Sequence, residues 1–591
     1  MNRTPPLASA RRIASAALAA CLFWAGPGLA QTAAPTAPQP APILSGSDRF
    51  HPVLARSGMV ASQEATATRV GRDILAAGGN AVDAAVAMGF ALAVTLPRAG
   101  NIGGGGFMLV HMAGSGETQA LDYRELAPAA ASRDMFLDAD GNADSEKSRY
   151  SGLAVGVPGT VAGFHTAHAR HGSGRFSFAD LIAPAIALAR DGFPVSDDLS
   201  GSLKQAHPRL SKDPAALATF YKPDGGFYEP GETLRQPQLA ATLQKIADEG
   251  PDGFYKGPVA EAIAARVREG GGDMTADDLA AYEAKWRTPV SGTYRGYEIV
   301  SMPPPSSGGV HLVEILNMLE PFDLAASGSG SAATLHVMAE AMKRAYADRS
   351  EFLGDPDFVD IPVKGLTSKT YAASRMADFD TAKATPADGL SPGKPAPYES
   401  EETTHYSVVD GQGNAVSNTY TLNFSYGVGM MAGDTGILLN NELDDFSAKP
   451  GVPNAYGLIG GDANAVAPRK RPLSSMSPTL VFRDGRLVLA TGSPGGSRII
   501  TTVLQIILNV VDHGMNIAEA TAAPRMHHQW LPDEIRIEEG FSPDTLAILR
   551  ERGHTVEERA TMGSTQSVMA VENGLAGASD PRVQGALAAG Y

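Results

Sequence analysis

The chain has 591 residues, of which 43% are hydrophobic and 19% are charged, and it contains 65 glycines and 41 prolines. Its sequence shows no internal repeat. This composition is that of a globular protein and excludes a fibrous, coiled-coil or wholly disordered one. The net charge of −16 leaves no basic surplus for a nucleic-acid partner, and the single cysteine excludes a disulfide framework, a cysteine-rich zinc site and an iron–sulfur cluster. The length allows about four domains or one large catalytic unit.

The first thirty residues have the order of a secretory signal peptide. Three arginines precede an apolar stretch, residues 13–24, and small residues end at Ala30, where we expect cleavage. Cys21 lies in a segment that resembles a bacterial lipobox, and an N-terminal anchor is a second alternative, although the apolar stretch is short for a membrane span. We predict a periplasmic or secreted protein with residues 31–45 as a disordered leader and no membrane span in the mature chain.

Strand and helix patterns alternate after the leader. Residues 58–62 read as a strand, and residues 62–77 as a helix that ends at two glycines. Asn80 can cap a second helix that runs to about Thr95 and is apolar nearly all round, so we expect it to be buried. Further helices are predicted at 180–189, 238–248, 259–268 and 333–353, and further strands at 107–111 and 297–301. This mixture predicts an α+β or α/β body in which helices cover sheets.

The sharpest change in composition is a segment rich in proline and glycine, residues 384–402, which we expect to be an exposed loop. Two strand patterns follow it, residues 403–410 and 414–423, joined by a Gly-Gln-Gly turn. A hairpin loop of three residues places Thr403 opposite Thr421 on one face of the sheet, with Cβ atoms about 5 Å apart. A loop of two or four residues would shift this register.

A threonine that begins a strand directly after an exposed loop suggests an N-terminal nucleophile. If the bond between Glu402 and Thr403 is cut, the new α-amine lies beside the Thr403 hydroxyl and can act as its general base without a histidine. Asn423, two residues beyond Thr421, points to the same face and completes a polar cluster at the strand end. The two threonines could instead be an ordinary β-sheet pair, since threonine is common in strands.

Further motifs resemble those of γ-glutamyltranspeptidases, in one order from about residue 56 to the end of the chain. They are T-T-H-Y-S-V-V-D from Thr403, Y-T-L-N from Tyr420, G-I-L-L-N-N-E-L-D-D-F-S from Gly436, R-P-L-S-S-M-S-P-T from Arg471 and T-G-S-P-G-G-S-R from Thr491. Upstream lie G-N-A-V-D-A-A-V-A, G-G-G-G-F-M-L-V, D-Y-R-E around Arg124 and M-P-P-P-S-S-G-G from Met302. The resemblance implies an α+β, αββα-sandwich N-terminal-nucleophile hydrolase. It also implies self-cleavage into a large subunit, residues 46–402, and a small catalytic subunit, residues 403–591.

Carried onto this chain, the family pattern gives catalytic roles to four residues. Thr403 is the nucleophile, and Thr421 carries the hydroxyl that bonds to it, the same pair that the hairpin register brings together. Gly495 and Gly496 match the oxyanion hole, at a turn between a strand and an apolar helix where free N–H groups cluster. A phosphate loop is the competing interpretation of this turn, but no G-K-[ST] follows it.

A γ-glutamyl donor carries an α-carboxylate and an α-ammonium, and the resemblance implies groups for each. The carboxylate-binding set is Arg124, Ser474 and Ser475, and the ammonium-binding set is Asn423, Glu442 and Asp445. Glu442 occupies a position that is glutamine in some bacterial members, so the pocket carries one extra negative charge. Residues 450–461 match the lid loop of bacterial members, with Tyr456 as its aromatic cover.

Two other groups of residues favour structural roles. His527 and His528 are adjacent and lack the i, i+4 spacing of a helical zinc site, so we expect packing roles for both. Residues 103–106 could cradle an anion, but the apolar run after them favours a tight turn into a buried strand. The resemblance implies neither a metal nor an organic cofactor.

Together these features predict a periplasmic γ-glutamyltransferase/hydrolase that acts on glutathione and related γ-glutamyl amides and transfers the γ-glutamyl group to water, amino acids or peptides. One alternative is a cephalosporin acylase of the same superfamily, which accepts glutaryl side chains without the ammonium; Asp445 and Asn423 argue against it. A second is a non-catalytic amino-acid-binding protein, which would need neither Thr403 nor the loop before it.

Overall fold

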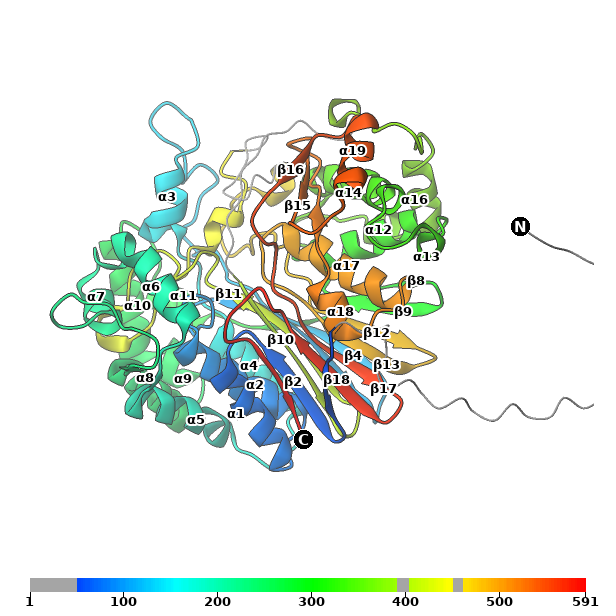
Figure 1. Cartoon of the computed structure of the whole chain (residues 1–591). Helices are drawn as coiled ribbons and strands as arrows, with labels where there is room; N and C mark the ends of the chain where they lie inside the picture. Colours follow the sequence, from blue (N-terminus) through cyan, green and yellow to red (C-terminus); the bar gives the residue numbers. More distant parts are fainter. Residues whose placement is uncertain (1–49, 391–402, 450–460) are drawn as a thin grey trace, which may run out of the picture. The chain divides into compact units, whose positions relative to one another are not determined.

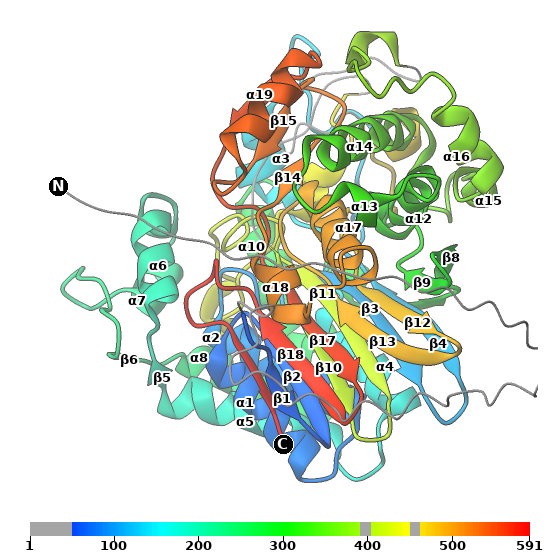
Figure 2. The same cartoon turned by 45° about the vertical axis from the view of Figure 1, so that its right-hand side comes forward.

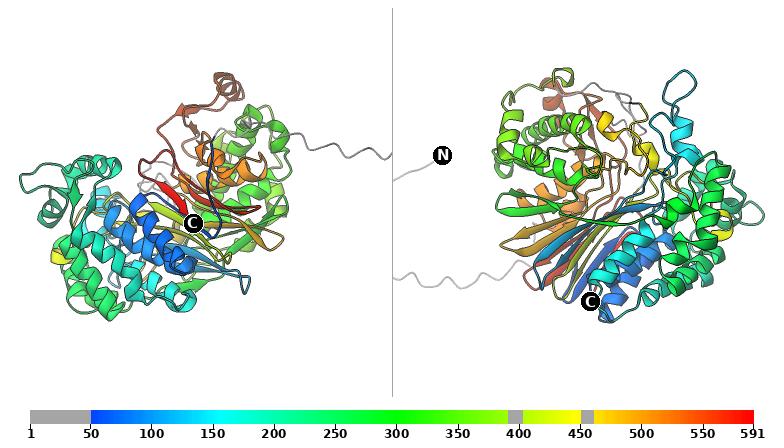
Figure 3. Two further views of the ribbon diagram at one scale, coloured as in Figure 1. Left: turned by 60° about the horizontal axis from the view of Figure 1, so that its bottom comes forward. Right: turned by 180° about the vertical axis from the view of Figure 1, so that it is seen from behind.

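Two seven-stranded sheets lie face to face, and helices cover the outer face of each sheet (Figure 1). The computed structural model describes residues 50–390, 403–449 and 461–591, all of which belong to one structural unit, Asp48–Tyr591. The views in Figures 2 and 3 show the two strand layers between the two groups of helices. The predicted αββα sandwich is therefore confirmed, while the predicted signal peptide and leader lie outside the described residues.

Every neighbouring pair of strands within the two large sheets is antiparallel. The first sheet has the order β19 (Leu587–Gly590), β2 (Gly58–Ser62), β10 (Thr404–Asp410), β11 (Ala415–Thr421), β3 (Gly105–Met112), β4 (Glu117–Tyr123) and β7 (Lys285–Arg287). The second has the order β1 (Val53–Ala55), β18 (Gly574–Ser579), β17 (Gln566–Val571), β13 (Arg486–Thr491), β12 (Thr479–Arg483), β9 (Tyr297–Ser301) and β8 (Val290–Tyr294). Small sheets join β5 (Phe193–Pro194) to β6 (Thr233–Leu234), and β14 (Met526–His527), β15 (Ile535–Ile537) and β16 (Val556–Glu558).

The helices divide between the two outer faces. The first sheet is covered by α1 (Ala65–Ala76), α2 (Ala81–Thr95) and α4 (Thr160–His171), with α5 (Phe178–Asp191), α8 (Pro237–Glu249) and α10 (Gly257–Glu269) beyond them. The second is covered by α12 (Gly308–Leu319), α17 (Arg498–Val511) and α18 (Ile517–Ala522), with α14 (Ala332–Phe352) packed on α12. The other helices are α3 (Ser145–Tyr150), α6 (Asp197–Leu210), α7 (Pro214–Phe220), α9 (Asp252–Tyr255), α11 (Ala276–Ala280), α13 (Leu324–Ser327), α15 (Val363–Leu366), α16 (Lys369–Arg375) and α19 (Pro543–Glu551). No helix in the described ranges is long and apolar enough to cross a membrane.

The predicted helix starts hold for α2 and shift for α1. Asn80 and Asp83 form a capping box at the start of α2, every residue of which is buried, as its apolar pattern predicted. Helix α1 begins at Ala65, three residues later than predicted, because Ser62 is the last residue of β2. The side chain of Glu64 then accepts hydrogen bonds from two backbone N–H groups of the first turn.

Alternate residues of β2 divide the core into two parts. Val60 belongs to the apolar cluster between the first sheet and α2, whereas Met59 and Ala61 belong to the cluster between the sheets and α12, α14 and α17. This period of two is that of a strand buried on both faces.

The hairpin of β10 and β11 has the predicted register. Thr404 pairs with Tyr420 and Val409 with Ala415, around a loop of three residues in which Gly413 has φ +85°. A left-handed glycine at this position is typical of three-residue hairpin loops. Both strands lie inside the first sheet; β10 pairs with β11 from Thr404 and with β2 from Tyr406.

Both large sheets combine strands from before and after residues 391–402. The earlier part of the chain supplies β2, β3, β4 and β7 to the first sheet and β1, β8 and β9 to the second. A cut between residues 402 and 403 would therefore leave two chains that share both sheets and both cores.

Candidate active site

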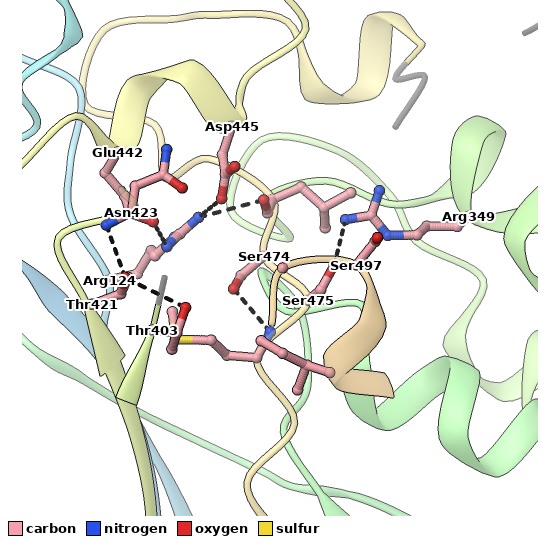
Figure 4. Close-up of a pocket in the computed structure, with 14 residues that line it drawn as sticks. Arg124, Arg349, Thr403, Thr421, Asn423, Glu442, Asp445, Ser474, Ser475 and Ser497 are labelled. Carbon is pink, nitrogen blue, oxygen red and sulfur yellow. Dashed lines mark hydrogen bonds and ion pairs between the residues drawn. The ribbon is translucent and has the colours of Figure 1, made fainter. Parts of the chain in front are cut away.

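A pocket lies at the start of β10, where the hairpin meets the turn before α17 and the short helix η4 (Glu442–Asp445) (Figure 4). It brings together most of the predicted site residues: Arg124, Thr403, Thr421, Asn423, Glu442, Asp445, Ser474, Ser475 and Gly496. Gly495 precedes Gly496 but is not among the lining residues. Tyr456 lies outside the described residues, and its role stays a prediction.

The two threonines face each other as the hairpin register predicted. The Thr403 hydroxyl donates to the Thr421 hydroxyl at 3.5 Å, the long end of the range for such a bond. The Thr421 hydroxyl also accepts a hydrogen bond of 2.8 Å from the backbone N–H of Asn423. Thr421 thus connects the first residue of the hairpin to the residue that follows its second strand.

His405 lies on the same face of β10 as Thr403, two residues further on. Its ring contacts the hydroxyls of Thr419 at 2.8 Å and Ser407 at 3.1 Å. Burial lowers the pKa of His405 to about 3, so the ring is neutral at physiological pH. A Cβ at Gly492 would lie 2.3 Å from the ring, so only glycine fits there. His405 therefore packs between the sheets and does not line the pocket.

The turn between β13 and α17 contains two consecutive glycines at the start of α17, one of which lines the pocket. Gly495 has φ +128° and Gly496 has φ +55°, conformations that side chains disfavour. Within the described chain no hydrogen bond from the N–H of either glycine is recorded. Free N–H groups at the start of a helix of this length favour a negative charge.

Arg124 follows β4 directly and is completely buried. One terminal nitrogen bonds to the Glu442 carboxylate and the other to the Asp445 carboxylate, both on η4. Nε donates to the Pro472 carbonyl at 3.2 Å, and Nη2 also reaches the Leu473 carbonyl at 3.5 Å. Most of the donors of this guanidinium are therefore occupied within the protein.

Three carboxylates crowd around Arg124. Besides Glu442 and Asp445, an oxygen of Glu125 lies 3.9 Å from Nη1. Burial raises the pKa of all three carboxyl groups, and Arg124 opposes this rise. The charge of Glu125 also raises the pKa of Glu442, so Glu442 keeps its proton to a higher pH than an exposed carboxyl group would.

Two serines form another wall of the pocket and are held by the segment that begins at Met302. Ser307 N–H donates to the Ser474 carbonyl and Ser474 N–H to the Pro305 carbonyl, each at 2.8 Å. A Cβ at Gly308 would lie 2.3 Å from the hydroxyl of Ser477, so the segment approaches too closely for a side chain. The two sequence motifs are therefore parts of one wall.

Sequence reasoning missed two polar pocket residues, Arg349 and Ser497. Arg349 comes from the last turn of α14 and donates to the hydroxyls of Ser307 at 2.9 Å and Ser475 at 3.1 Å. Burial lowers its pKa to about 10, so it stays charged at neutral pH. Ser497 precedes α17, and its hydroxyl donates to Gln529. Nothing in the local pattern of either helix marks these side chains as facing a pocket.

The residues predicted to have structural roles have packing contacts. Cβ atoms at Gly103 and Gly104 would lie 2.1 and 2.0 Å from backbone oxygens, which explains the glycines before β3. His527 contacts the Thr501 hydroxyl at 2.8 Å, and His528 lies 3.2 Å from Asp533.

A buried cluster outside the pocket has the residue types of a metal site. The ligand atoms of His336, Glu340 and His554 lie within 4.8 Å of one another. The buried ammonium of Lys343 lies 2.8 Å from Glu340, and the two imidazoles are hydrogen-bonded to each other. A lysine thus already supplies the positive charge that the glutamate requires.

Comparison with known proteins gives consistent results. Residues 67–590 match the family model described as Gamma-glutamyltranspeptidase. The chain is 58% identical over 585 residues to the glutathione hydrolase proenzyme of Escherichia coli (strain K12), covering 98% of this chain and 99% of that one. It resembles the crystal structure of cephalosporin acylase from Bacillus halodurans with a TM-score of 0.79 at 28% identity, over 95% of this chain and 99% of that one. For the crystal structure of Helicobacter pylori gamma-glutamyltranspeptidase the TM-score is 0.55 at 45% identity, over 58% of this chain and 97% of that chain.

Proposed function

This chain belongs to the gamma-glutamyltranspeptidase family, and from that premise we propose that it is an enzyme that cleaves the γ-glutamyl amide of glutathione and related compounds. The observation that carries the proposal is that Thr403 lines one pocket together with carboxylates, which can bind an ammonium, and with serines and arginines, which can bind a carboxylate. The Thr403 hydroxyl attacks the γ-amide carbonyl and the amine leaves, giving a γ-glutamyl ester on Thr403. Water or the amine of an amino acid or peptide then resolves this ester.

The same hydroxyl would free its own amine in the precursor. Attack of the Thr403 hydroxyl on the Glu402 carbonyl converts the peptide bond into an ester, and water hydrolyses the ester to give a carboxylate on Glu402 and an amine on Thr403. The E. coli relative is named a proenzyme, which agrees with such a step. Because strands on both sides of the cut interleave in both sheets, the two products, residues 31–402 and 403–591, would remain one heterodimer.

Proton transfer during turnover falls to the α-amine of Thr403. His405 is neutral, and its ring is engaged with Thr419 and Ser407. The Thr421 hydroxyl orients the nucleophile, and the N–H groups of Gly495 and Gly496 stabilise the oxyanion of the tetrahedral intermediate.

The donor's two charged groups would bind to two different sets of pocket residues. Glu442 and Asp445 attract the α-ammonium. The side-chain amide nitrogen of Asn423 donates to the Asn441 carbonyl at 3.0 Å, which leaves the amide oxygen to accept a bond from the ammonium. Arg124, Ser474 and Ser475 take the α-carboxylate. A glutaryl substrate has no ammonium, so an acylase that acts on such substrates would not require Glu442 and Asp445 for binding.

A signal peptide, residues 1–30, would deliver the precursor to the periplasm or outside the cell, with lipid attachment at Cys21 as the alternative.

The direct test combines intact-mass analysis of the purified protein with a γ-glutamyl anilide assay. We expect two chains that separate under denaturing conditions, the smaller beginning at Thr403, together with release of the aniline. An uncut chain that binds amino acids without turnover would instead identify a binding protein.

Thr421→Val is expected to slow both chain cleavage and turnover, with kcat/KM lowered about tenfold or more, because valine has no hydroxyl to hold Thr403. Thr404→Val is the matched control: its hydroxyl is buried on the other face of β10 and has no hydrogen-bond partner within the described part of the chain. Cleavage is followed on denaturing gels and turnover with the anilide. Equal losses in the two variants would contradict the role given to the hairpin register.

Arg124→Lys is expected to lower kcat/KM for γ-glutamyl anilide by about ten- to a hundredfold, since an ammonium keeps the charge but cannot form a two-pronged contact with a carboxylate. Chain cleavage should survive, because self-cleavage requires no donor. A folded but uncut Arg124→Lys protein would show that the bonds to Glu442 and Asp445 are required for the site to form.

A further inference from the structure

The pocket contains two arginines whose surroundings differ sharply. Arg124 is bonded to the carboxylates of Glu442 and Asp445 and to two backbone carbonyls. Its charge is therefore compensated before any ligand arrives. A carboxylate that relied on Arg124 alone would enter a pocket whose lining sets two carboxyl groups, Glu442 and Asp445, against one arginine, with Glu125 lying behind them.

Arg349 has much weaker compensation, because Asp445 attracts it electrostatically without forming an ion pair with it. It is 5% exposed, and two of its nitrogens donate to neutral hydroxyls, those of Ser307 and Ser475. No carboxylate among the described residues pairs with it, and its third nitrogen, Nη1, has no recorded hydrogen bond within that part of the chain. A buried charge without a hydrogen-bonded counter-charge is costly, and this one lines the pocket.

The two serines beside Arg349 have hydroxyl protons to offer. Ser475 Oγ accepts a bond from Arg349 Nη2 at 3.1 Å, and Ser474 Oγ accepts one from the backbone N–H of Met476 at 3.1 Å. Neither hydroxyl donates to an acceptor within the described residues. With their oxygens held by N–H donors, both can direct a proton into the pocket, at a position across from Glu442 and Asp445 (Figure 4).

We propose that Arg349 is a specificity-determining and positioning residue for the donor's α-carboxylate. It holds the Ser475 hydroxyl in place, and it supplies a positive charge for the carboxylate, since the charge of Arg124 is already paired with Glu442 and Asp445. This inference rests on the proposed γ-glutamyl activity and adds a residue to it. With Arg349 counted, two arginines face two carboxylates at the pocket wall, and a zwitterionic amino-acid head group can bind without changing that balance.

The test uses three competing acids that differ in one charged group each: L-glutamate, glutarate, which lacks the ammonium, and 4-aminobutyrate, which lacks the α-carboxylate. Their inhibition constants are measured against γ-glutamyl anilide with the processed wild-type, Arg349→Gln and Arg349→Lys enzymes. Arg349→Gln should weaken L-glutamate and glutarate about ten- to a hundredfold and 4-aminobutyrate less than about threefold. Arg349→Lys, which keeps the charge, should recover a large part of the loss.

Arg344→Gln is the control for a general disturbance of α14. Arg344 is also buried in this helix, but it bonds to Glu340 and Asp378 away from the pocket. Its substitution should change the affinity for all three acids by one common factor. The same uniform change in Arg349→Gln, or no change for L-glutamate, would overturn the proposal.

The outcome is separable from the proposed function. If Arg349→Gln is not processed, Arg349→Lys carries the comparison, with a smaller loss for the two acids that keep the carboxylate. Wild-type enzyme that fails to hydrolyse γ-glutamyl anilide would count against the activity itself, and calorimetric binding of the three acids would then still decide the role of Arg349.

Discussion

Thr403→Ala is expected to remain one uncut chain and to hydrolyse γ-glutamyl anilide at least about 10⁴-fold more slowly than the wild type, which should separate into residues 31–402 and 403–591. The Thr403 hydroxyl is the nucleophile in both self-cleavage and donor hydrolysis. Without it, only the small rate enhancement that the surrounding groups provide by themselves remains. Among the described residues Thr403 makes a single long side-chain bond, to Thr421, so the variant should still fold. Intact mass and a denaturing gel show whether the chain is cut, and the anilide assay measures the rate of hydrolysis.

Thr403→Ser is the matched control, because it keeps the hydroxyl and removes only a methyl group. It should be cut and should turn over, although more slowly. Wild-type protein that is active without being cut would reject the N-terminal-nucleophile mechanism, because the general base would then not be a free amine.

The position of the nucleophile could be predicted from the sequence because the hairpin is local. A loop of three residues sets the register, and strand alternation sets the face, so the pairing of Thr403 with Thr421 requires no information about the rest of the chain. The same local reasoning predicts the start of α1 three residues too early. Ser62 is of a residue type that can cap a helix, but in the structure it is the last residue of β2.

The order of strands in the two sheets is not local. β1 pairs with β18 and β2 with β19, so the two ends of the described chain are neighbours. No pattern within either segment indicates such a pairing, and only the resemblance to a known family predicted the sandwich.

Arg349 escaped prediction because α14 is buried over most of its length, and its last turn carries no signal that separates a pocket residue from a packed one. The partners of Arg124 escaped for a different reason. Arg124, Glu442 and Asp445 were predicted as separate contacts for the two charges of a ligand, but in a buried site these opposite charges also bond to one another.

Donor choice gives the second large effect. Wild-type enzyme is expected to prefer γ-glutamyl over glutaryl anilide by at least about a hundredfold in kcat/KM, because a glutaryl group lacks the ammonium and forms none of its contacts with Asn423, Glu442 and Asp445. A difference of this size corresponds to about 2.8 kcal/mol in transition-state binding. Asp445→Asn should narrow the gap, chiefly by slowing the γ-glutamyl reaction.

Asp444→Asn is the control, since Asp444 is the neighbouring acid on η4, bonds to Ser148 and does not line the pocket. Its ratio of the two kcat/KM values should equal that of the wild type. The B. halodurans acylase shares the fold of this chain, so the fold cannot distinguish the two activities, and the ratio can. Comparable wild-type values for the two anilides would favour an acylase. An unchanged ratio in Asp445→Asn would mean that the ammonium is held elsewhere, and that Asp445 serves only to compensate the charge of Arg124.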